Sequence, residues 1–450
     1  MNLSFSFDTG LQQRDILHRA AALLQMGEGG KAREALLGVR AHRIFDLQEA
    51  VIAVEMLLDV NLVDAALAMA ERVREIDPLH PECADLLTEC RFLIDRPANW
   101  RREGSDIRAA LEHVNALARA HPRLATDRHV HIVCNLDSLG GTERRALNLH
   151  RMLCTHMPTT LWSTAPPHAA YRDEAPIRLI EGRAEAPSGG TLALIGTYYD
   201  CNDLLERGRF ERMIICHNLM EQNQKLLSYL KRIENNPAHP PVELTFPSTM
   251  FGDLLGLPGT AEYSAVDLVR FQRRREHAAT TDLAIGRHGR AYAYKYHFND
   301  GAFFRDLVAR GYRVRLLGGS AIERVFSHDA GARPELIAEG AVDARDFLDS
   351  LDLFVFRKHP QWVETGGAVI LEAMAMELPV IVFPELCGCA ELIVHGENGF
   401  LVSSEAEAFE TIERLRAAPD LRRRIGGAAR QTLIELQRRQ QPELLARYRG

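Results

Sequence analysis

From its start to about residue 97 the chain carries apolar side chains at helical spacing. They recur three or four positions apart, first as Ile16, Ala20, Leu23 and Leu24 and then as Ala32, Ala35, Leu36 and Val39. Residues 65–78 are rich in alanine, which permits close contact between helices, and Pro78 ends that helix. One more amphipathic helix is predicted over residues 100–120. The pattern therefore predicts an all-helical region with a linker helix over residues 1–125.

Paired helices with small residues at the contact resemble tetratricopeptide repeats. The match amounts to two degenerate units, fewer than the three or more that a free-standing array needs. The region is therefore either a helical cap packed on the next domain or a module that docks a protein partner, and the sequence favours neither.

From residue 129 the pattern changes to short apolar runs that alternate with helices. The first run, residues 129–134, is followed by a glycine loop and a helix over residues 144–153. Later runs lie at 191–196, 212–216 and 243–246, and a second set lies at 283–286, 313–319, 351–356 and 379–383. Such alternation predicts an α/β protein with two doubly wound parallel sheets and a ligand cleft at the strand ends. We assign residues 126–272 and 273–450 to the two domains, with a hinge in the arginine-rich residues 271–277.

Composition indicates a globular protein but does not identify its function. The 450 residues are 46% hydrophobic and 26% charged, as in a globular protein, and too many for one ordinary core. A net charge of -7 gives no support for a nucleic-acid partner. The first residues lack the pattern of a secretory signal, and no run of about 18 apolar residues occurs. We expect a cytoplasmic protein.

The 8 cysteines do not form a metal-binding pattern. Only Cys387 and Cys389 are close in sequence, and no second pair completes a zinc site. Asp-x-Asp, Walker and His-Glu-x-x-His motifs are absent as well. We expect reduced thiols, no bound metal and no cofactor.

Residues 364–372 combine two glutamates with two glycines in a way that favours an anionic ligand. Gly366 and Gly367 open a predicted helix whose first amides lack intrahelical partners, which makes an anion site. Glu364 lies before this helix and Glu372 within it. Their spacing of about two helical turns would return both to one face, where we expect them to bracket a sugar phosphate.

With the Ala-Met-Ala and Leu-Pro-Val that follow it, this stretch resembles the signature of retaining GT-B glycosyltransferases of family 4. Five further pieces occur in the order typical of that family: Gly140-Gly141-Thr142-Glu143, residues 214–218 ending in His217-Asn218, residues 245–248 with 264–271, Ile285-Gly286-Arg287, and residues 396–402. Ser264 replaces the asparagine usual in the family. The resemblance spans roughly residues 128–402 and leaves out the helical region.

The resemblance implies a nucleotide-sugar site with a cationic side. A diphosphate leaving group needs positive partners, and Arg287 and Lys295 are assigned to it. Lys295 stands farther from Arg287 than is usual in the family, so Arg290 is an equal candidate for the second cation. The amides of Gly366 and Gly367 would bind the same diphosphate.

The other site residues would contact the sugar and the ribose. The resemblance places Glu372 on the ribose, Glu364 near the donor sugar, and His217 against the sugar or the acceptor. For His217 the alternative is a structural histidine with satisfied hydrogen bonds. Gly140 and Gly141 would let the backbone approach the donor closely.

The predicted function is a retaining transfer of a sugar from a UDP- or GDP-linked donor, with UDP favoured. The acceptor would be a glycan or lipid-linked glycan of cell-surface polysaccharide. A sugar-nucleotide epimerase of the same fold is one alternative, and a weakly catalytic scaffold that binds a protein through its helices is another. Residues 421–450 are predicted to form a helix that crosses back onto the first domain, and its basic face could rest on the inner surface of a membrane.

Overall fold

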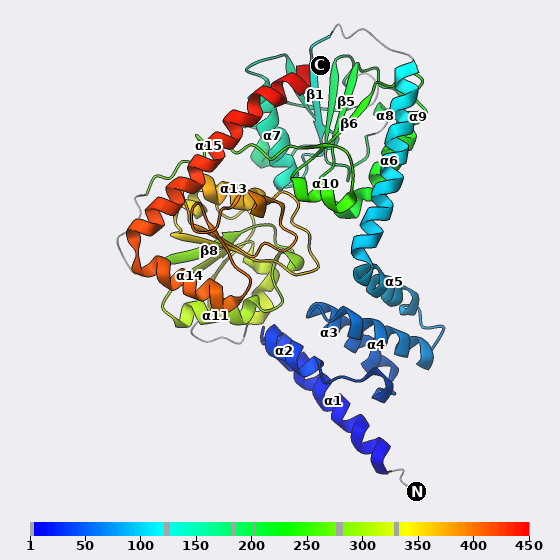
Figure 1. The fold of residues 1–450 in the computed structure, drawn as a ribbon, viewed down its shortest axis with the longest axis vertical. Helices are drawn as coiled ribbons and strands as arrows, with labels where there is room; N and C mark the ends of the chain where they lie inside the picture. Colours follow the sequence, from blue (N-terminus) through cyan, green and yellow to red (C-terminus); the bar gives the residue numbers. More distant parts are fainter. Residues whose placement is uncertain are drawn as a thin grey trace. The chain divides into compact units, whose positions relative to one another are not determined.

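A computed structural model describes residues 4–120, 127–181, 185–201, 203–275, 282–327 and 333–449 (Figure 1). The chain divides into two compact units, each made of three separate stretches. Unit 1 contains Met1–Asn99, Thr280–Val342 and Arg357–Trp362, and unit 2 contains Trp100–Ala279, Asp343–Phe356 and Val363–Gly450. Both units draw on more than one predicted domain, so the boundaries at 125 and 272 stay predictions.

The first part of unit 1 is helical, as the apolar spacing predicts. Its α-helices are α1 (Ser4–Gln25), α2 (Gly29–Leu36), α3 (Leu47–Asp59), α4 (Val63–Ile76) and α5 (Cys83–Ile94). Helix α1 packs on α2, α3 on α4, and α4 on α5. Ala53, Ala66 and Ala70 are fully buried, because small side chains let α3 and α4 approach closely. The likeness to tetratricopeptide repeats remains a prediction.

The second part of unit 1 is a parallel βα segment on which the helices are seated. It contains β8 (Ala284–His288), α11 (Asp300–Ala309), β9 (Arg313–Leu317) and β10 (Glu335–Ile337). The carbonyl of Gly27 accepts the Ala302 N–H at 3.0 Å, and the Gly30 N–H donates to Asn299 Oδ1 at 2.8 Å. A Cβ at Gly29 would lie 2.1 Å from the Phe298 carbonyl oxygen. This close fit supports the helical-cap interpretation.

The sheet of the first Rossmann-like domain lies in unit 2 and has seven parallel strands. Their order is β3-β2-β1-β4-β5-β6-β7, with β1 at Val130–Cys134, β2 at Thr159–Ser163, β3 at Ile177–Leu179, β4 at Thr191–Ile195, β5 at Arg212–Cys216, β6 at Val242–Phe246 and β7 at Thr260–Ala261. Alternate residues of a strand face opposite sides of the sheet. Val133 and Leu194 belong to one core and Ile132 and Ala193 to another, which explains why the strands are continuous apolar runs.

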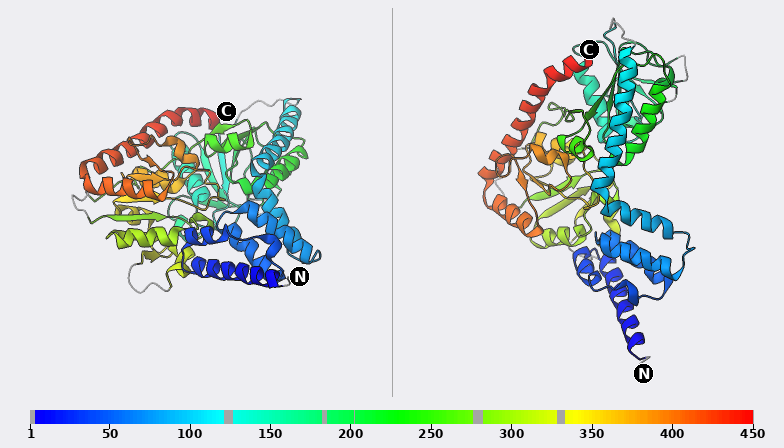
Figure 2. Two further views of the ribbon diagram at one scale, coloured as in Figure 1. Left: turned by 60° about the horizontal axis from the view of Figure 1, so that its bottom comes forward. Right: turned by 45° about the vertical axis from the view of Figure 1, so that its right-hand side comes forward.

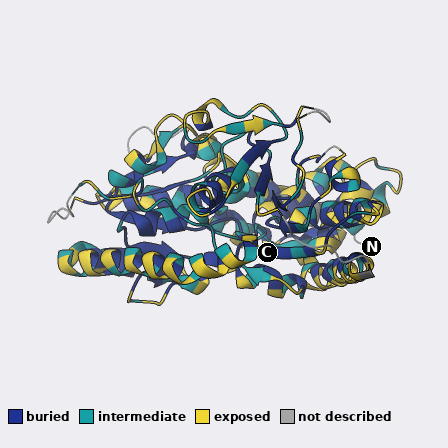
Figure 3. Ribbon diagram, turned by 90° about the horizontal axis from the view of Figure 1, so that it is seen from above, coloured by how far each residue is buried: buried dark blue, intermediate teal, exposed yellow. Residues whose placement is uncertain are grey.

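Helices cover both faces of this sheet. On one face the core includes residues from α6 (Arg96–Ala120), α8 (Leu204–Arg207), α9 (Asn223–Glu234) and α10 (Thr249–Leu255). On the other face it includes residues from α7 (Gly141–Leu153) and α15 (Pro419–Arg449). Figure 3 shows the strands as mostly buried.

The second parallel sheet has six strands. Strands β10, β9 and β8 lie side by side in that order, as do β11 (Leu353–Phe356), β12 (Val380–Val382) and β13 (Phe400–Leu401). The helices that accompany the last three strands are α12 (Ala344–Asp349), α13 (Ala368–Ala375) and α14 (Glu405–Ala417). Two parallel sheets with flanking helices confirm the predicted α/β fold of two Rossmann-like domains with an added helical region.

Helix α15 crosses back onto the first Rossmann-like domain, as predicted (Figure 2). Near its end, the Tyr448 carbonyl accepts the Thr191 hydroxyl at 3.3 Å, and the Tyr448 hydroxyl lies 3.3 Å from Glu262. Arg447 pairs with Glu243 at 2.7 Å. The buried contacts show that the crossing is structural. In the described parts of the chain, no helix has the length and apolarity needed to cross a bilayer.

Two stretches contain elements that the apolar runs did not indicate. Residues 158–190 carry β2 and β3, and residues 219–241 carry α9. The buried residues of α9, which are Asn223, Leu226, Tyr229, Leu230 and Ile233, follow helical spacing, but its polar face concealed the pattern. The hinge predicted over 271–277 lies partly outside the described residues.

Candidate functional site

The predicted site residues lie in both compact units. Unit 1 holds the three candidate cations Arg287, Arg290 and Lys295. Unit 2 holds the glutamates, the histidine and the glycines, which are Gly140, Gly141, His217, Glu364, Gly366, Gly367 and Glu372.

The start of α13 is built around Gly367. This residue has φ 57°, in the left-handed region, and a Cβ on it would lie 2.2 Å from the sulfur of Cys389. Both the backbone angle and the lack of space require glycine. Gly366 has Pro247 beside it, 3.1 Å from where its Cβ would be. The chain is thus folded so that the first amides of a buried helix face the loop before it, which is the geometry that favours an anion.

Glu364 lies in the loop before α13, and not on the helix. Helix α13 begins at Ala368, so the expectation that both glutamates share one helical face is wrong. The Glu364 carboxylate instead accepts the Gly367 N–H at 3.3 Å. Its backbone is fixed by Cys387 and its neighbours, since the Glu364 N–H donates to the Leu386 carbonyl at 2.9 Å and the Gly388 N–H donates to the Glu364 carbonyl at 2.8 Å. Glu364 therefore holds the loop that presents the helix start.

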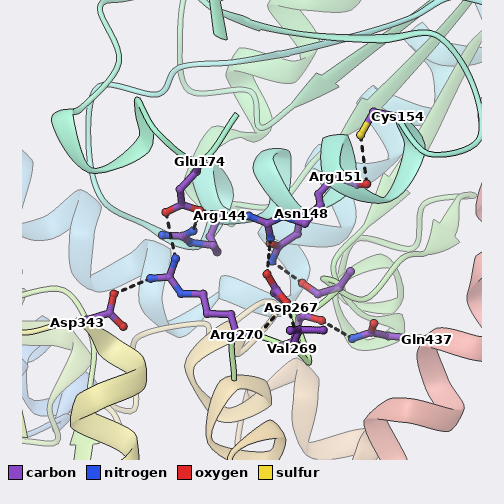
Figure 4. Close-up of polar contacts among 12 residues, drawn as sticks. Arg144, Asn148, Arg151, Cys154, Glu174, Asp267, Val269, Arg270, Asp343 and Gln437 are labelled. Atoms are coloured by element: carbon purple, nitrogen blue, oxygen red, sulfur yellow. Dashed lines mark hydrogen bonds and ion pairs between the residues drawn. The ribbon is translucent and has the colours of Figure 1, made fainter. Parts of the chain in front are cut away.

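Glu372 lies in α13 near a network of arginines that the sequence did not indicate. Desolvation of its carboxyl raises the pKa of Glu372 to about 7, while Arg144 and Arg270 act to lower it. Figure 4 shows both arginines pointing at Glu174. Arg270 also pairs with Asp343 at 2.7 Å. The network joins α7, the loop that contains Glu174 and the start of α12, and it places positive charge near the predicted ribose ligand.

The same network continues along α7. Arg151 pairs with Asp267 at 2.9 Å and donates to Asn148 Oδ1 at 3.1 Å (Figure 4). The Asn148 amide donates to the Ala265 carbonyl at 2.8 Å. These contacts anchor residues 264–271, one of the pieces that resemble the glycosyltransferase pattern, to the helix that follows the glycine loop.

His217 is fully buried, and side chains bond both of its ring nitrogens. Nδ1 lies 3.0 Å from the Thr197 hydroxyl, and Nε2 lies 2.8 Å from Asn223 Oδ1. Burial lowers the pKa of His217 to about 4, so the ring is neutral near pH 7. Asn223 is held in turn by Glu103 at 2.7 Å. This geometry fits the structural alternative, and contact with a sugar or acceptor remains a prediction.

The glycine loop lies against the start of α13. Gly140 is the residue before α7, and its N–H donates to the Tyr171 hydroxyl at 3.3 Å. Gly141 is exposed, and a Cβ on it would lie 3.6 Å from Ala368 Cβ. The Thr365 hydroxyl donates to the Asn218 carbonyl at 2.7 Å, so the strand-end segment also touches the loop. Three segments predicted to line the site are therefore neighbours within unit 2.

In unit 1, Arg287 is enclosed in a cluster of charged groups. It is 1% exposed, donates to the Arg357 carbonyl, and stacks 4.4 Å from the Tyr296 ring centroid. Asp300 lies 4.0 Å from Arg287 and 2.8 Å from Arg357. The sequence did not indicate Arg357, which lies 70 residues after Arg287, or Asp300, which lies in α11. Direct contact between Arg287 and a phosphate remains a prediction.

Lys295 and Arg290 differ in their surroundings. Lys295 is partly buried, with its ammonium 4.6 Å from the Trp362 ring centroid. Arg290 is exposed. Lys358, which the sequence did not single out, is buried and donates to the Trp362 carbonyl at 2.5 Å. Lys295 and Lys358 therefore both contact Trp362, and the second cation, Lys295 or Arg290, stays a prediction.

Among the described residues, no group of three or more His, Cys, Asp or Glu side chains has the geometry of a metal site. Cys387 and Cys389 are both buried free thiols with sulfurs 3.6 Å apart. Cys389 packs on Gly367, so the pair contributes to the shape of the loop before α13.

The fold is that of the GT-B class, with two Rossmann-like sheets in one chain. A structure of Anabaena HepE in complex with UDP is 14% identical, with a TM-score of 0.52 over 71% of this chain and 98% of that chain. A glycosyltransferase from Rickettsia africae is 14% identical, with a TM-score of 0.53 over the same shares. Sucrose-phosphate synthase from Thermosynechococcus elongatus is 16% identical, with a TM-score of 0.51 over 72% and 98%. These likenesses show the fold.

The sequence family described as Glycosyl transferases group 1 matches residues 283–417. No curated protein sequence matches the chain. The matched segment contains the cations of unit 1 as well as Glu364 and Glu372. The protein is a glycosyltransferase, and residues 283–417 carry the match.

Proposed function

We propose that this glycosyltransferase moves a sugar with retention of configuration from a UDP- or GDP-linked donor, with UDP favoured, to a glycan or lipid-linked acceptor of cell-surface polysaccharide. The observation that carries the proposal is the start of α13. A left-handed glycine with no room for a side chain opens the helix, one glutamate lies before it, and another lies within it. The bound UDP in the HepE structure is consistent with such a donor.

Each predicted residue has a role in this reaction. The bond between the anomeric carbon and the phosphate oxygen breaks, and the electron pair leaves with the diphosphate. Lys295 or Arg290, Arg287 and the amides at the start of α13 stabilise that charge. The acceptor oxygen then attacks the same face of the sugar, and its proton passes to the departing phosphate. Glu372 holds the ribose and Glu364 lies near the sugar.

His217 does not act as an acid or base in this scheme. Its pKa of about 4 keeps the ring neutral across the physiological range, so it can only donate or accept a hydrogen bond. We propose that the reaction uses no divalent metal and no cofactor, and that the protein works in the cytoplasm, with α15 in peripheral contact with the membrane. The helical region would serve as a cap, with protein docking as a second role.

A thermal-shift screen of nucleotide-sugars tests the proposal. A donor present at about 100 times its dissociation constant stabilises the folded state by about 2.7 kcal/mol, which is a readily measured shift. We expect UDP-sugars to raise the melting temperature, and we expect release of UDP from the best donor when acceptor glycans are added. If no UDP- or GDP-sugar shifts the melting temperature or is consumed, the proposal is wrong.

A further inference from the structure

The side chain of Asn218 lies between the three predicted site segments of unit 2. Its amide nitrogen is 2.6 Å from the hydroxyl of Thr142, which follows the glycine loop. The main-chain carbonyl of Asn218 accepts the hydroxyl of Thr365, which stands between Glu364 and Gly366. Asn218 itself directly follows His217. One residue thus connects the glycine loop, the strand end and the loop before α13.

Asn218 has one polar atom that the protein leaves unpaired. The residue is 7% exposed, and its buried Oδ1 has no hydrogen-bond partner among the residues that the structure describes. A threonine hydroxyl can donate as well as accept, so exchanging the amide oxygen and nitrogen leaves the other atom unpaired instead. A buried polar atom without a partner costs about 1–3 kcal/mol and needs an explanation.

We infer that the unpaired amide atom of Asn218 binds a sugar hydroxyl and so helps to select the sugar. A hydroxyl can donate to Oδ1 or accept from Nδ2, so it satisfies either orientation of the amide. A site that pairs a buried polar group only with the correct sugar discriminates strongly, because the wrong sugar leaves that group unpaired. The inference rests on the proposed function and deepens it. The hydroxyl belongs either to the donor sugar or to the acceptor sugar.

The test compares binding of UDP with binding of the best UDP-sugar, by calorimetry, in wild type and in Asn218→Ala. If the hydroxyl belongs to the donor sugar, Asn218→Ala weakens UDP-sugar binding about tenfold or more while the affinity for UDP stays within about twofold. If it belongs to the acceptor, the ratio of the two affinities is unchanged, and binding of methyl glycosides to the UDP-bound protein weakens instead.

A matched control separates this role from a structural one. Asn236 is also a buried asparagine of unit 2, but its amide is fully bonded to the backbone at Leu205, Gly208 and Ala238. We expect Asn236→Ala to lower the melting temperature. The ratio of the affinities for UDP-sugar and UDP, and the binding of methyl glycosides, should stay unchanged.

Two results would point elsewhere. If Asn218→Ala changes neither the UDP-sugar to UDP ratio nor glycoside binding, the unpaired atom holds only a water and the inference is wrong. If wild type binds no nucleotide-sugar at all, the proposed function fails first. The two failures are therefore distinguishable.

Discussion

Two opposing effects act on the pKa of Glu372, the burial of its carboxyl and the charge of nearby arginines. Its carboxyl is desolvated within α13, yet the guanidinium groups of Arg144 and Arg270 lie close enough to affect its charge. The first effect favours the protonated form and the second the ionised form, and desolvation is the larger. A carboxyl that titrates near neutral pH can change both the stability of the protein and its affinity for a donor.

Replacing Glu372 tests its assignment to the ribose. A hydrogen bond to a charged group contributes about 1.5–3 kcal/mol, so Glu372→Ala should weaken binding of the UDP-sugar about 10- to 100-fold. Calorimetry measures the affinity, and circular dichroism checks that the fold is kept. Glu413→Ala changes an exposed glutamate on α14 and should leave the affinity unchanged. Equal affinities for wild type and Glu372→Ala would rule out the ribose role.

The raised pKa of Glu372 also predicts how stability varies with pH. The folded state holds the proton up to about pH 7, whereas the unfolded state releases it near the ordinary value of 4.5. The extra stability is therefore complete below about pH 4.5 and is lost as the pH rises through 7. Relative to Glu372→Gln, wild type should lose about 1–3 kcal/mol of unfolding free energy between pH 5 and pH 8. A difference that does not vary with pH, measured by urea denaturation, would contradict this.

Some of these residues could be found from the sequence and others could not. Gly367 could be found, because its neighbours in the sequence indicate a helix start. Its positive φ in the structure explains why glycine stands there. The partners of Arg144 and Arg270 could not be found, because Glu174 and Asp343 belong to segments far along the chain. Asn218 was visible only as part of a motif, since an unpaired amide is a property of packing.

At the scale of elements, buried helices and central strands were predictable and short or polar ones were not. Strand β5 matches its predicted bounds because residues 212–216 are almost wholly apolar. Strand β2 begins with two threonines and β3 is only three residues long, so neither gives a clear apolar run. Pairing of β2 with β1 and of β3 with β2 makes them strands, and no local pattern encodes these contacts.

Helix α15 offers a matched pair of glycines for testing how it packs. A Cβ at Gly426 would lie 2.0 Å from the Glu377 carbonyl oxygen, whereas one at Gly427 would have no described atom within 4 Å. Gly426→Ala should therefore cost about 1–3 kcal/mol of unfolding free energy through overpacking. Gly427→Ala should gain about 0.5–1 kcal/mol, because alanine favours a helix more than glycine does. Chemical denaturation measures both changes in unfolding free energy. Equal effects would show that α15 does not pack against the backbone at Glu377.

At the scale of the whole molecule, the site is expected to draw its positive charge from side chains and helix amides. Transfer activity should then survive EDTA at millimolar concentration, with a rate within about twofold of the untreated enzyme. The measurement is release of UDP from the best donor, and added Mg²⁺ or Mn²⁺ should not increase it tenfold. Loss of activity with EDTA and its recovery with a divalent ion would show that a metal takes part.

The three-stretch composition of unit 1 affects how the protein is made on the ribosome. Helices α1 to α5 leave the ribosome early, but the residues that Gly27 and Gly30 contact, Ala302 and Asn299, are synthesised about 200 residues later. At about 5–20 residues per second, the nascent helices wait roughly 10–40 seconds for that segment. During this interval the surface of α2 around Gly29, which later packs on Phe298, is open to solvent and to chaperones. Translation speed between residues 99 and 302 should therefore influence the yield of folded protein.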